Sequence, residues 1–251
     1  MTPPALIMPM AGRGSRFARN GEPLPKPLID LSGRPFFWWA VQSVRKFSPL
    51  RELLFVVLEE HCQEFGLDRR ILGFFPAASI LRLPEVTSGA AETARLGIEA
   101  LRADGPIAIN DCDHAFLCPS LAAFAERTAT AAAGSLLCFR SNSPAYSYAM
   151  LGPDGSVTNT VEKQVVSPYA IAGCYLFASR GRFLRAYEKY SASCPYNELF
   201  ISGLYNTLIA DGERILAFEL TRHCTFGTPE ELARADLSGI AEKLIPDAVS
   251  S

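Results

Sequence analysis

An apolar strand at the start of this chain runs directly into a turn rich in glycine and arginine. Leu6–Met8 is a short apolar run of the kind that forms a buried strand, and residues 11–16, AGRGSR, must end it. Gly12 and Gly14 can adopt positive φ and let another group approach the backbone closely. The amides of this turn can therefore converge as a nest of N–H donors, which suits an anion.

The segment between Arg16 and Lys26 contains Gly21, Pro23 and Pro25. This composition favours an ordered but irregular loop over a helix or strand. Lys26 lies between two prolines, so its backbone is stiff and its ammonium group can be aimed. An amide nest, an arginine and a positioned lysine together suit a polyphosphate.

Two common phosphate-binding motifs do not fit these residues. A dinucleotide fingerprint needs a third glycine at position 17, where this chain has Phe17, and a P-loop needs Gly-Lys followed by Ser or Thr. The pattern Gly12-x-Gly14-Ser15-Arg16, followed by Pro25-Lys26, instead resembles the signature of the sugar-phosphate nucleotidyltransferases, the NDP-sugar pyrophosphorylase-like family. A glycine-rich turn with a solvated lysine is the structural alternative.

The resemblance implies an α/β fold with a Rossmann-like, GT-A-type mixed sheet, helices on both faces and a small β-rich acceptor lobe. It corresponds to a short form of the family without a C-terminal acyltransferase domain. Arg16, Lys26 and Asp113 are then expected to be catalytic. The implied contacts to the nucleotide come from Met10, Ala11, Gly12, Arg13, Gly14 and Ser15.

Length and composition restrict the number of domains and the kinds of partner that this chain can have. A chain of 251 residues can form one large domain, and we predict a single domain over 1–251. The formal net charge of -2 gives no overall reason to bind nucleic acid or an anionic membrane. Neither a signal peptide nor an apolar run long enough to cross a bilayer is apparent. Seven cysteines without a C-x-x-C pair predict reduced, mostly buried thiols and a cytoplasmic protein.

Helices and strands are predicted to alternate after Lys26. A helix from Pro35 to Phe47 has apolar residues at helical spacing. Its aromatic cluster, residues 36–39, is predicted to be core rather than a surface that stacks on a base. Strands are expected at 53–58 and 80–83, with a helix near 62–67 between them.

The segment 84–93 is predicted to lead into a helix that runs to about Leu101, with Ser88 as its N-cap. Small residues before a helix leave room for a flat ligand against the backbone. The family resemblance implies that Ser88, Gly89 and Ala90 contact the nucleobase and ribose. Taken alone, this segment supports that role and an ordinary helix start equally.

A predicted strand at 107–109 runs into a cluster of two carboxylates and a histidine. Asp111 and Asp113 would lie at the carboxyl end of this strand, where ligands collect in open α/β sheets. Hard oxygen ligands there favour Mg²⁺, and the resemblance implies that Asp113 binds the metal while Asp111 assists and contacts the nucleotide. His114 is expected to form hydrogen bonds rather than to bind the metal. Two capping or turn aspartates are the alternative.

The pattern then changes from alternating α and β to antiparallel β. After a helix at 119–133 and a strand at 135–139, a tight turn at 152–155 predicts a hairpin of 146–151 with 157–161. We place the boundary between a nucleotide-binding half, about 1–140, and an acceptor-binding half, about 141–251, at this change. The family resemblance implies that Glu162 contacts the sugar and Lys163 its phosphate; a solvated surface pair is the alternative.

The last part of the chain contributes a strand at 170–177, in which Gly173 matches a family glycine that lets the acceptor approach. Helices are predicted at 180–190 and 197–210, a strand at 215–220, and a final helix that opens at Pro229. One residue departs from the family pattern. Thr225 stands where a second metal-binding aspartate is common, so the ion would depend on Asp113, phosphate and water, or the site would be weak.

The implied reaction joins an NTP to a sugar 1-phosphate or another small phosphorylated acceptor and releases pyrophosphate. The sequence does not show which NTP is used, CTP, GTP, UTP or dTTP. The expected role is the synthesis of precursors for capsule, lipopolysaccharide or another surface glycan. A glycosyltransferase that uses the Asp111-x-Asp113 spacing, or an inactive nucleotide-binding protein, are the alternatives. The chain could also form a homo-oligomer.

Overall fold

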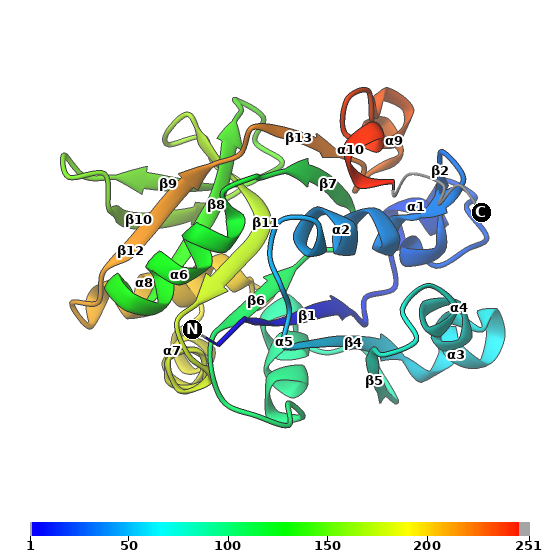
Figure 1. The fold of residues 1–251 in the computed structure, drawn as a ribbon, viewed down its shortest axis with the longest axis horizontal. Helices are drawn as coiled ribbons and strands as arrows, with labels where there is room; N and C mark the ends of the chain where they lie inside the picture. Colours follow the sequence, from blue (N-terminus) through cyan, green and yellow to red (C-terminus); the bar gives the residue numbers. More distant parts are fainter. Residues whose placement is uncertain (1, 246–251) are drawn as a thin grey trace.

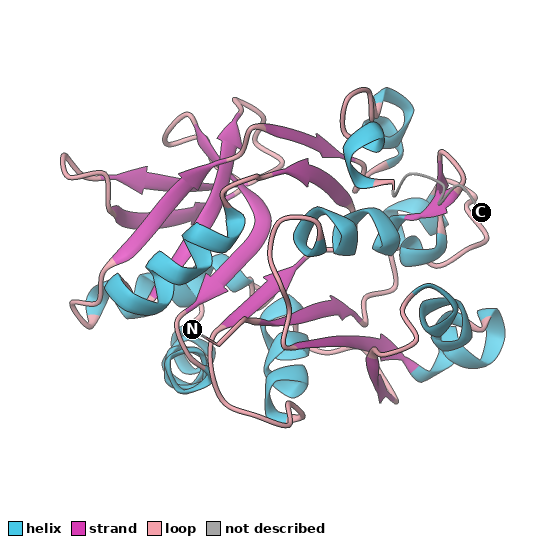
Figure 2. Ribbon diagram, viewed as in Figure 1, coloured by secondary structure: helices cyan, strands magenta, loops and turns pink. Residues whose placement is uncertain are grey.

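The computed structural model describes residues 2–245, and within them nine strands form one mixed sheet with helices on both faces (Figures 1 and 2). The strand order is β10-β9-β11-β6-β1-β4-β5, with β8 paired to β11 and β12 paired to β8. The strands are β1 Ala5–Met10, β2 Asp30–Leu31, β3 Arg34–Pro35, β4 Glu52–Leu58, β5 Ser79–Leu83, β6 Ile107–Asn110, β7 His114–Leu117, β8 Gly134–Arg140, β9 Ser147–Leu151, β10 Val157–Glu162, β11 Tyr169–Phe177, β12 Ile215–Glu219 and β13 Arg222–Thr225. The helices are α1 Ser15–Arg19, a 3-10 turn Lys26–Leu28, α2 Phe36–Arg45, α3 Glu59–Phe65, α4 Leu67–Phe74, α5 Ala90–Glu99, α6 Leu121–Ala131, α7 Arg180–Ser193, α8 Ile201–Ala210, α9 Pro229–Arg234 and α10 Ala241–Leu244.

Strand β1 lies in the middle of a parallel array and is buried on both faces. It pairs in parallel with β4 and β6, and β4 pairs in parallel with β5. Successive side chains of a strand point to opposite faces. Leu6 and Met8 accordingly belong to the hydrophobic cluster that contains α2, while Ala5 and Ile7 belong to the cluster on the α5 side. This explains why the first strand has a continuous apolar sequence.

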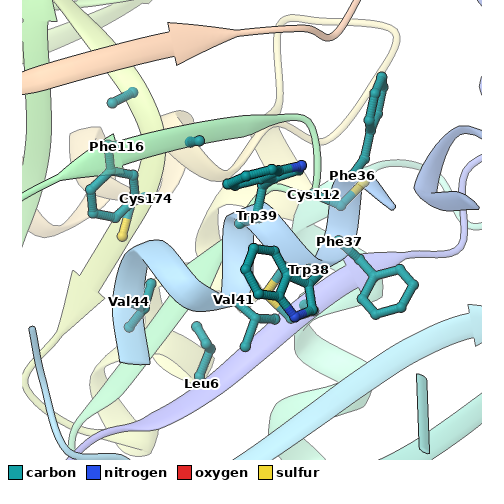
Figure 3. Close-up of a cluster of buried hydrophobic side chains, with 14 of the residues drawn as sticks. Leu6, Phe36, Phe37, Trp38, Trp39, Val41, Val44, Cys112, Phe116 and Cys174 are labelled. Carbon is teal, nitrogen blue, oxygen red and sulfur yellow. The ribbon is translucent and has the colours of Figure 1, made fainter. Parts of the chain in front are cut away.

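The aromatic cluster at the start of α2 is part of the core, as predicted. Phe36, Phe37 and Trp39 are fully buried, and Figure 3 shows the side chains of the cluster on both sides of α2, with Phe36 and Trp39 on one side and Trp38 and Val41 on the other. The indole N–H of Trp39 donates to the carbonyl of Leu31 at 2.8 Å. A buried indole needs such a partner, so this residue anchors the loop that follows Lys26 rather than offering a surface to a base.

Strand β11 joins the parallel array to the antiparallel part of the sheet. It pairs antiparallel with β6, β8 and β9, and the β9–β10 hairpin extends the sheet at its edge. The predicted hairpin and the predicted mixed α/β sheet are therefore confirmed. The hairpin continues the central sheet, so the part predicted to bind the acceptor belongs to the same layer as the strands predicted to bind the nucleotide. The predicted boundary between halves near residue 140 stays a prediction.

Several predicted elements differ from the structure. The segment between Arg16 and Lys26 is not wholly irregular, because α1 occupies its first residues. The helix predicted near 62–67 is two short helices, α3 and α4, separated by Gly66 at φ +64°. The helix predicted from residue 197 begins at Ile201. Residues 197–200 instead lie against the start of α5, a tertiary contact that has no local sequence signal.

Two pairs of short strands, β2 with β3 and β7 with β13, were absent from the sequence prediction. Strands β7 and β13 pair antiparallel, with His114 opposite Thr225, although more than 100 residues separate them in the chain. Helix α9 begins at Pro229 as predicted, but it is not the final helix, because α10 follows it. The Thr228 hydroxyl accepts a hydrogen bond from the amide of Glu231 as the N-cap of α9. Within residues 2–245, no helix has the length and apolar character needed to cross a membrane. Each of the seven cysteines is a free thiol, and all but Cys194 are buried, as predicted.

Candidate active site

A cavity of about 420 Å³ opens at the carboxyl ends of β1 and β6. Most of the residues predicted for the site line it, although they come from segments far apart in the chain: Met10, Ala11, Gly12, Gly14, Arg16, Lys26, Gly89, Ala90, Asp111, Asp113, Glu162, Lys163 and Gly173. Arg13, Ser15 and Ser88 do not line the cavity, so their contacts to a nucleotide stay predictions. The fold thus brings the predicted nucleotide and acceptor residues to one place.

Gly14 fixes the geometry between the glycine-rich turn and the lysine. It has φ +62°, and a Cβ at this position would lie 2.9 Å from Cβ of Lys26. A side chain there would be strained by the left-handed backbone and would also meet Lys26. The glycine and Pro25-Lys26 therefore depend on one another sterically, which accounts for their occurrence together in the sequence.

Lys26 and Asp113 form an ion pair inside the cavity. Nζ of Lys26 lies 2.9 Å from Oδ2 of Asp113, and both side chains are largely buried. Burial alone would lower the pKa of Lys26, but the charge of Asp113, the hydrogen bond to it and the charge of nearby Asp111 act together with the other acidic groups around it to raise that pKa. Burial opposes ionisation of Asp113, yet the Lys26 charge and hydrogen bond lower the pKa of that carboxyl. Both groups are held in their charged forms.

Asp111 interacts electrostatically with the same Lys26–Asp113 pair. Its amide donates to the carbonyl of Gly173 at 2.9 Å. Gly173 has φ +73°, and a Cβ there would lie 2.7 Å from Oδ2 of Asp111. Asp111 therefore occupies the space that a side chain at Gly173 would need. The expectation that the acceptor approaches the backbone at Gly173 stays a prediction. Burial and the charge of Asp113 raise the pKa of Asp111 well above its ordinary value.

The carboxylates of Asp111 and Asp113 match the hard oxygen ligands that Mg²⁺ prefers. Both line the cavity, beside the glycine-rich turn. No three His, Cys, Asp or Glu side chains converge as a metal cage in the described part of the chain. Magnesium commonly keeps several waters and binds through one or two carboxylates and substrate phosphates, so the donor set fits Mg²⁺ held partly by a nucleotide.

The loop before α5 is set by a neighbouring backbone segment. The Ser88 carbonyl accepts the amide of Leu199, and the Leu199 carbonyl accepts the amide of Ala91. A Cβ on Gly89 would lie 2.5 Å from the nitrogen of Leu199. Gly89 is consequently the N-cap, and the prediction that Ser88 caps α5 is wrong. The Ser88 amide and hydroxyl bond instead to Glu92.

This contact carries Glu198 and Phe200 into the cavity, and neither was predicted from the sequence. Lys163, the predicted ligand of the acceptor phosphate, has its ammonium 5.0 Å from the centre of the Phe200 ring. Its backbone is left-handed, with φ +52°. A lysine rarely adopts this conformation, and such strain is concentrated at functional sites. Glu162 accepts hydrogen bonds from Ser147 and Ser202, so it is not a solvated surface residue.

Thr225 takes part in a network of hydroxyl groups. Its Oγ1 lies 3.1 Å from the phenol oxygen of Tyr146, and that phenol donates to Oε1 of Glu231 at 2.6 Å. Burial and the hydrogen bond to Glu231 raise the pKa of Tyr146 to about 12. Thr228-x-x-Glu231 has the spacing of a capping box, which is the one sequence signal that could have drawn attention to Glu231.

His114 forms hydrogen bonds through both ring nitrogens, as predicted. Nδ2 of Asn110 donates to the carbonyl of Ala40 at 3.0 Å, so Oδ1 of Asn110 accepts from Nε2 of His114, also at 3.0 Å. Nδ1 of His114 then accepts from Nε2 of His223 at 3.0 Å. Burial lowers the pKa of His114 to about 4, so the imidazole is neutral. This chain of bonds supports the strand pair beneath the carboxylates.

Comparison with known families identifies the class of protein. Residues 6–191 match the family described as the MobA-like NTP transferase domain. The chain belongs to this family. The matched region contains the glycine-rich turn, Lys26, both aspartates and Lys163, so the predicted class of protein is confirmed at the level of the family.

Individual relatives are similar in sequence over part of the chain and in structure over nearly all of it. A 2-C-methyl-D-erythritol 4-phosphate cytidylyltransferase of Chromobacterium violaceum is 31% identical over 90 residues, which are 35% of this chain and 39% of that protein. The crystal structure of a nucleoside-diphosphate-sugar pyrophosphorylase from Vibrio cholerae RC9 has a TM-score of 0.77 and 27% identity, covering 91% of this chain and 98% of the other. An inositol-1-phosphate CTP transferase from T. maritima shares the fold with a TM-score of 0.74 at 15% identity, covering 100% of this chain and 98% of that one.

Proposed function

We propose that this protein transfers a nucleoside monophosphate from an NTP to a sugar 1-phosphate or another small phosphorylated acceptor, with release of pyrophosphate. The observation that carries the proposal is the convergence of the Gly12–Gly14 turn, Lys26, Asp113 and Lys163 on one cavity. The turn of amides with the cations Arg16 and Lys26 suits a triphosphate, and Lys163 suits a second phosphate.

The chemistry needs positioning more than proton transfer. An oxygen of the acceptor phosphate attacks the α-phosphorus in line, a new P–O bond forms, and the bond to the β-phosphate oxygen breaks as pyrophosphate leaves. No general base is required, because a phosphate oxygen is already ionised at neutral pH. The amides near Gly12 and Gly14 and the guanidinium of Arg16 would hold the triphosphate. Lys26 would stabilise charge at the α-phosphate, and Lys163 would hold the acceptor phosphate.

Asp113, assisted by Asp111, would hold Mg²⁺, which when bound neutralises phosphate charge and orients the triphosphate. The same Asp113 orients Lys26 through the ion pair. Thr225 at the second aspartate position leaves that ion fewer carboxylates from this chain, in keeping with a metal held partly by substrate oxygens. Synthesis of precursors for surface glycans, a cytoplasmic location and a possible homo-oligomer stay predictions.

Pyrophosphate release tests the proposal directly. The protein would be incubated with Mg²⁺ and each of CTP, GTP, UTP and dTTP, against sugar 1-phosphates and small phosphorylated alcohols and amino acids. Release with one pair, absent without the acceptor, supports the proposal and names base and acceptor together. Glycosyl transfer from an NDP-sugar without pyrophosphate release would identify the Asp111-x-Asp113 alternative. An NTP that raises the melting temperature without any turnover would identify a binding protein.

A further inference from the structure

Tyr146 contacts two separate segments of the cavity lining through different atoms. It precedes β9 and lines the cavity, where its phenol reaches Glu231 and Thr225 of the C-terminal segment. Its backbone carbonyl accepts the amide of Lys163 at 3.1 Å, just beyond the last paired residues of the β9–β10 hairpin. One residue therefore links the C-terminal segment to the lysine predicted to bind the acceptor.

The bond from Lys163 to Tyr146 lies at the point where the backbone becomes left-handed. Lys163 has φ +52°, a conformation that a residue with a side chain adopts only where its surroundings hold it. The amide bond to the Tyr146 carbonyl is a contact of this kind. The position of Tyr146 therefore decides the direction in which the Lys163 side chain leaves the hairpin.

The phenol of Tyr146 is itself held by the segment that contacts Asp113. Oε1 of Glu231 accepts a hydrogen bond from the phenol, and Oε2 accepts a hydrogen bond from the amide of Gly227 at 2.9 Å. Gly227 leaves room for Asp113, because a Cβ there would lie 2.3 Å from Oδ2 of that aspartate. The Phe226 amide also donates to the Asp113 carbonyl at 3.0 Å.

We propose that Tyr146 is a positioning residue that sets Lys163 relative to Asp113, through its phenol on Glu231 and its carbonyl on the Lys163 amide. The proposal rests on the proposed function for the role of Lys163 as the acceptor-phosphate ligand. It adds a residue to which the family motifs assign no role. It also assigns a role to the Thr225 hydroxyl, which forms a hydrogen bond with the phenol. In the family pattern this position is often a metal-binding aspartate.

The test compares Tyr146→Phe with the wild-type protein in two independent measurements. The Phe ring keeps the packing against Phe139, whose ring centre lies 5.1 Å away, so the fold is retained. We expect the KM for the acceptor to rise about tenfold, the effect of misplacing one hydrogen bond to a charged group, while the KM for the NTP stays unchanged. Amide hydrogen exchange of Lys163, followed by NMR, is expected to become faster.

Two further variants sharpen the comparison. Glu231→Gln keeps the bond from its own amide to the Thr228 hydroxyl but weakens the anchor of the phenol, so it should raise the acceptor KM in the same direction. The double variant should show no more than the larger single effect, because both changes break one chain of contacts. Tyr169→Phe, which removes a phenol that accepts from Arg140 outside the cavity, should leave both KM values unchanged.

An unchanged exchange rate at the Lys163 amide would overturn the proposal whether or not the protein is active. Equal increases in the KM for the acceptor and for the NTP would also overturn it, since a general loss of structure would produce that pattern. If the wild-type protein releases no pyrophosphate with any pair, the proposed function fails. The exchange measurement then still decides whether Tyr146 holds Lys163.

Discussion

The ammonium of Lys26 and the carboxylate of Asp113 lie 2.9 Å apart, so two groups with different predicted roles are bonded to one another. Each has a natural competitor in the proposed reaction. A triphosphate offers oxygens to Lys26, and a divalent cation offers charge to Asp113. The pair keeps both groups ionised in a largely buried site, where an unpaired charge would be costly. When a metal–nucleotide complex binds, the Lys26–Asp113 ion pair can therefore be replaced by two others, one between Lys26 and the triphosphate and one between Asp113 and the cation.

Replacement of Lys26 by alanine tests its role at the α-phosphate. We expect turnover to fall by about 10²-fold or more, the scale of a lost contact that stabilises developing charge. The measurement is the rate of pyrophosphate release at saturating NTP and acceptor. Lys189→Ala is the matched control, because Lys189 forms an exposed ion pair with Asp211 at 2.6 Å, away from the cavity. Near-normal turnover in Lys26→Ala would refute the role.

The proposed metal binding by Asp113 can be tested without catalysis. The EPR signal of free Mn²⁺ reports how much ion the protein binds in the presence of a non-hydrolysable NTP analogue. We expect Asp113→Asn to weaken Mn²⁺ binding at least tenfold, because the amide removes one charged oxygen ligand. Asp211→Asn provides the control from the exposed pair. Equal Mn²⁺ affinity in Asp113→Asn and the wild-type protein would show that the aspartate serves only to hold Lys26.

Some of this site was visible in the sequence because its signals are local. Gly14 and Lys26 are twelve residues apart, and the steric constraint that links them leaves a motif in one short stretch. The parallel strands and the hairpin were also predicted, since continuous apolar runs and a Gly-Pro-Asp-Gly turn are properties of a few neighbouring residues.

Other parts could not be predicted because they depend on contacts between distant segments. The N-cap of α5 is Gly89 rather than Ser88, since the backbone of Leu199 approaches too closely for a side chain. The pairing of β7 with β13 depends on register between four-residue strands with no distinctive pattern of their own. Tyr146 likewise acquires its role only when the C-terminal segment reaches it.

The steric role of Gly14 predicts a difference between two glycines of the same region. Gly14→Ala combines a left-handed backbone with a Cβ only 2.9 Å from Cβ of Lys26, whereas Gly21, at φ +84°, has no atom within 4 Å of such a Cβ. Gly21→Ala should therefore cost about 1 kcal/mol through backbone strain alone. Gly14→Ala should cost more and should also displace Lys26, so pyrophosphate release is lost.

Urea unfolding measures the stability of both glycine variants, and turnover is measured beside it. Equal loss of stability and equal turnover in Gly14→Ala and Gly21→Ala would mean that contact with Lys26 does not constrain the turn. A loss of turnover confined to Gly14→Ala, at similar stability, would place the effect on the direction of the lysine.

The raised pKa of Asp111 predicts how the stability of the metal-free protein depends on pH. Burial and the charge of Asp113 raise its pKa in the fold above the unfolded value near 4, so the folded state binds this proton more tightly. The stability that Asp111 contributes is complete below that unfolded value and is lost as pH rises through the folded pKa. At pH 8 the charged carboxylate consequently destabilises the fold, and Asp111→Asn should raise Tm there by a few degrees or more, at about 2–4 °C per kcal/mol for a chain of this size. Thermal unfolding in EDTA at pH 4 and pH 8 measures the effect, with Asp30→Asn in an exposed turn as the control. A gain in Tm that is the same at both pH values would contradict the prediction, because it would not depend on the charge of Asp111.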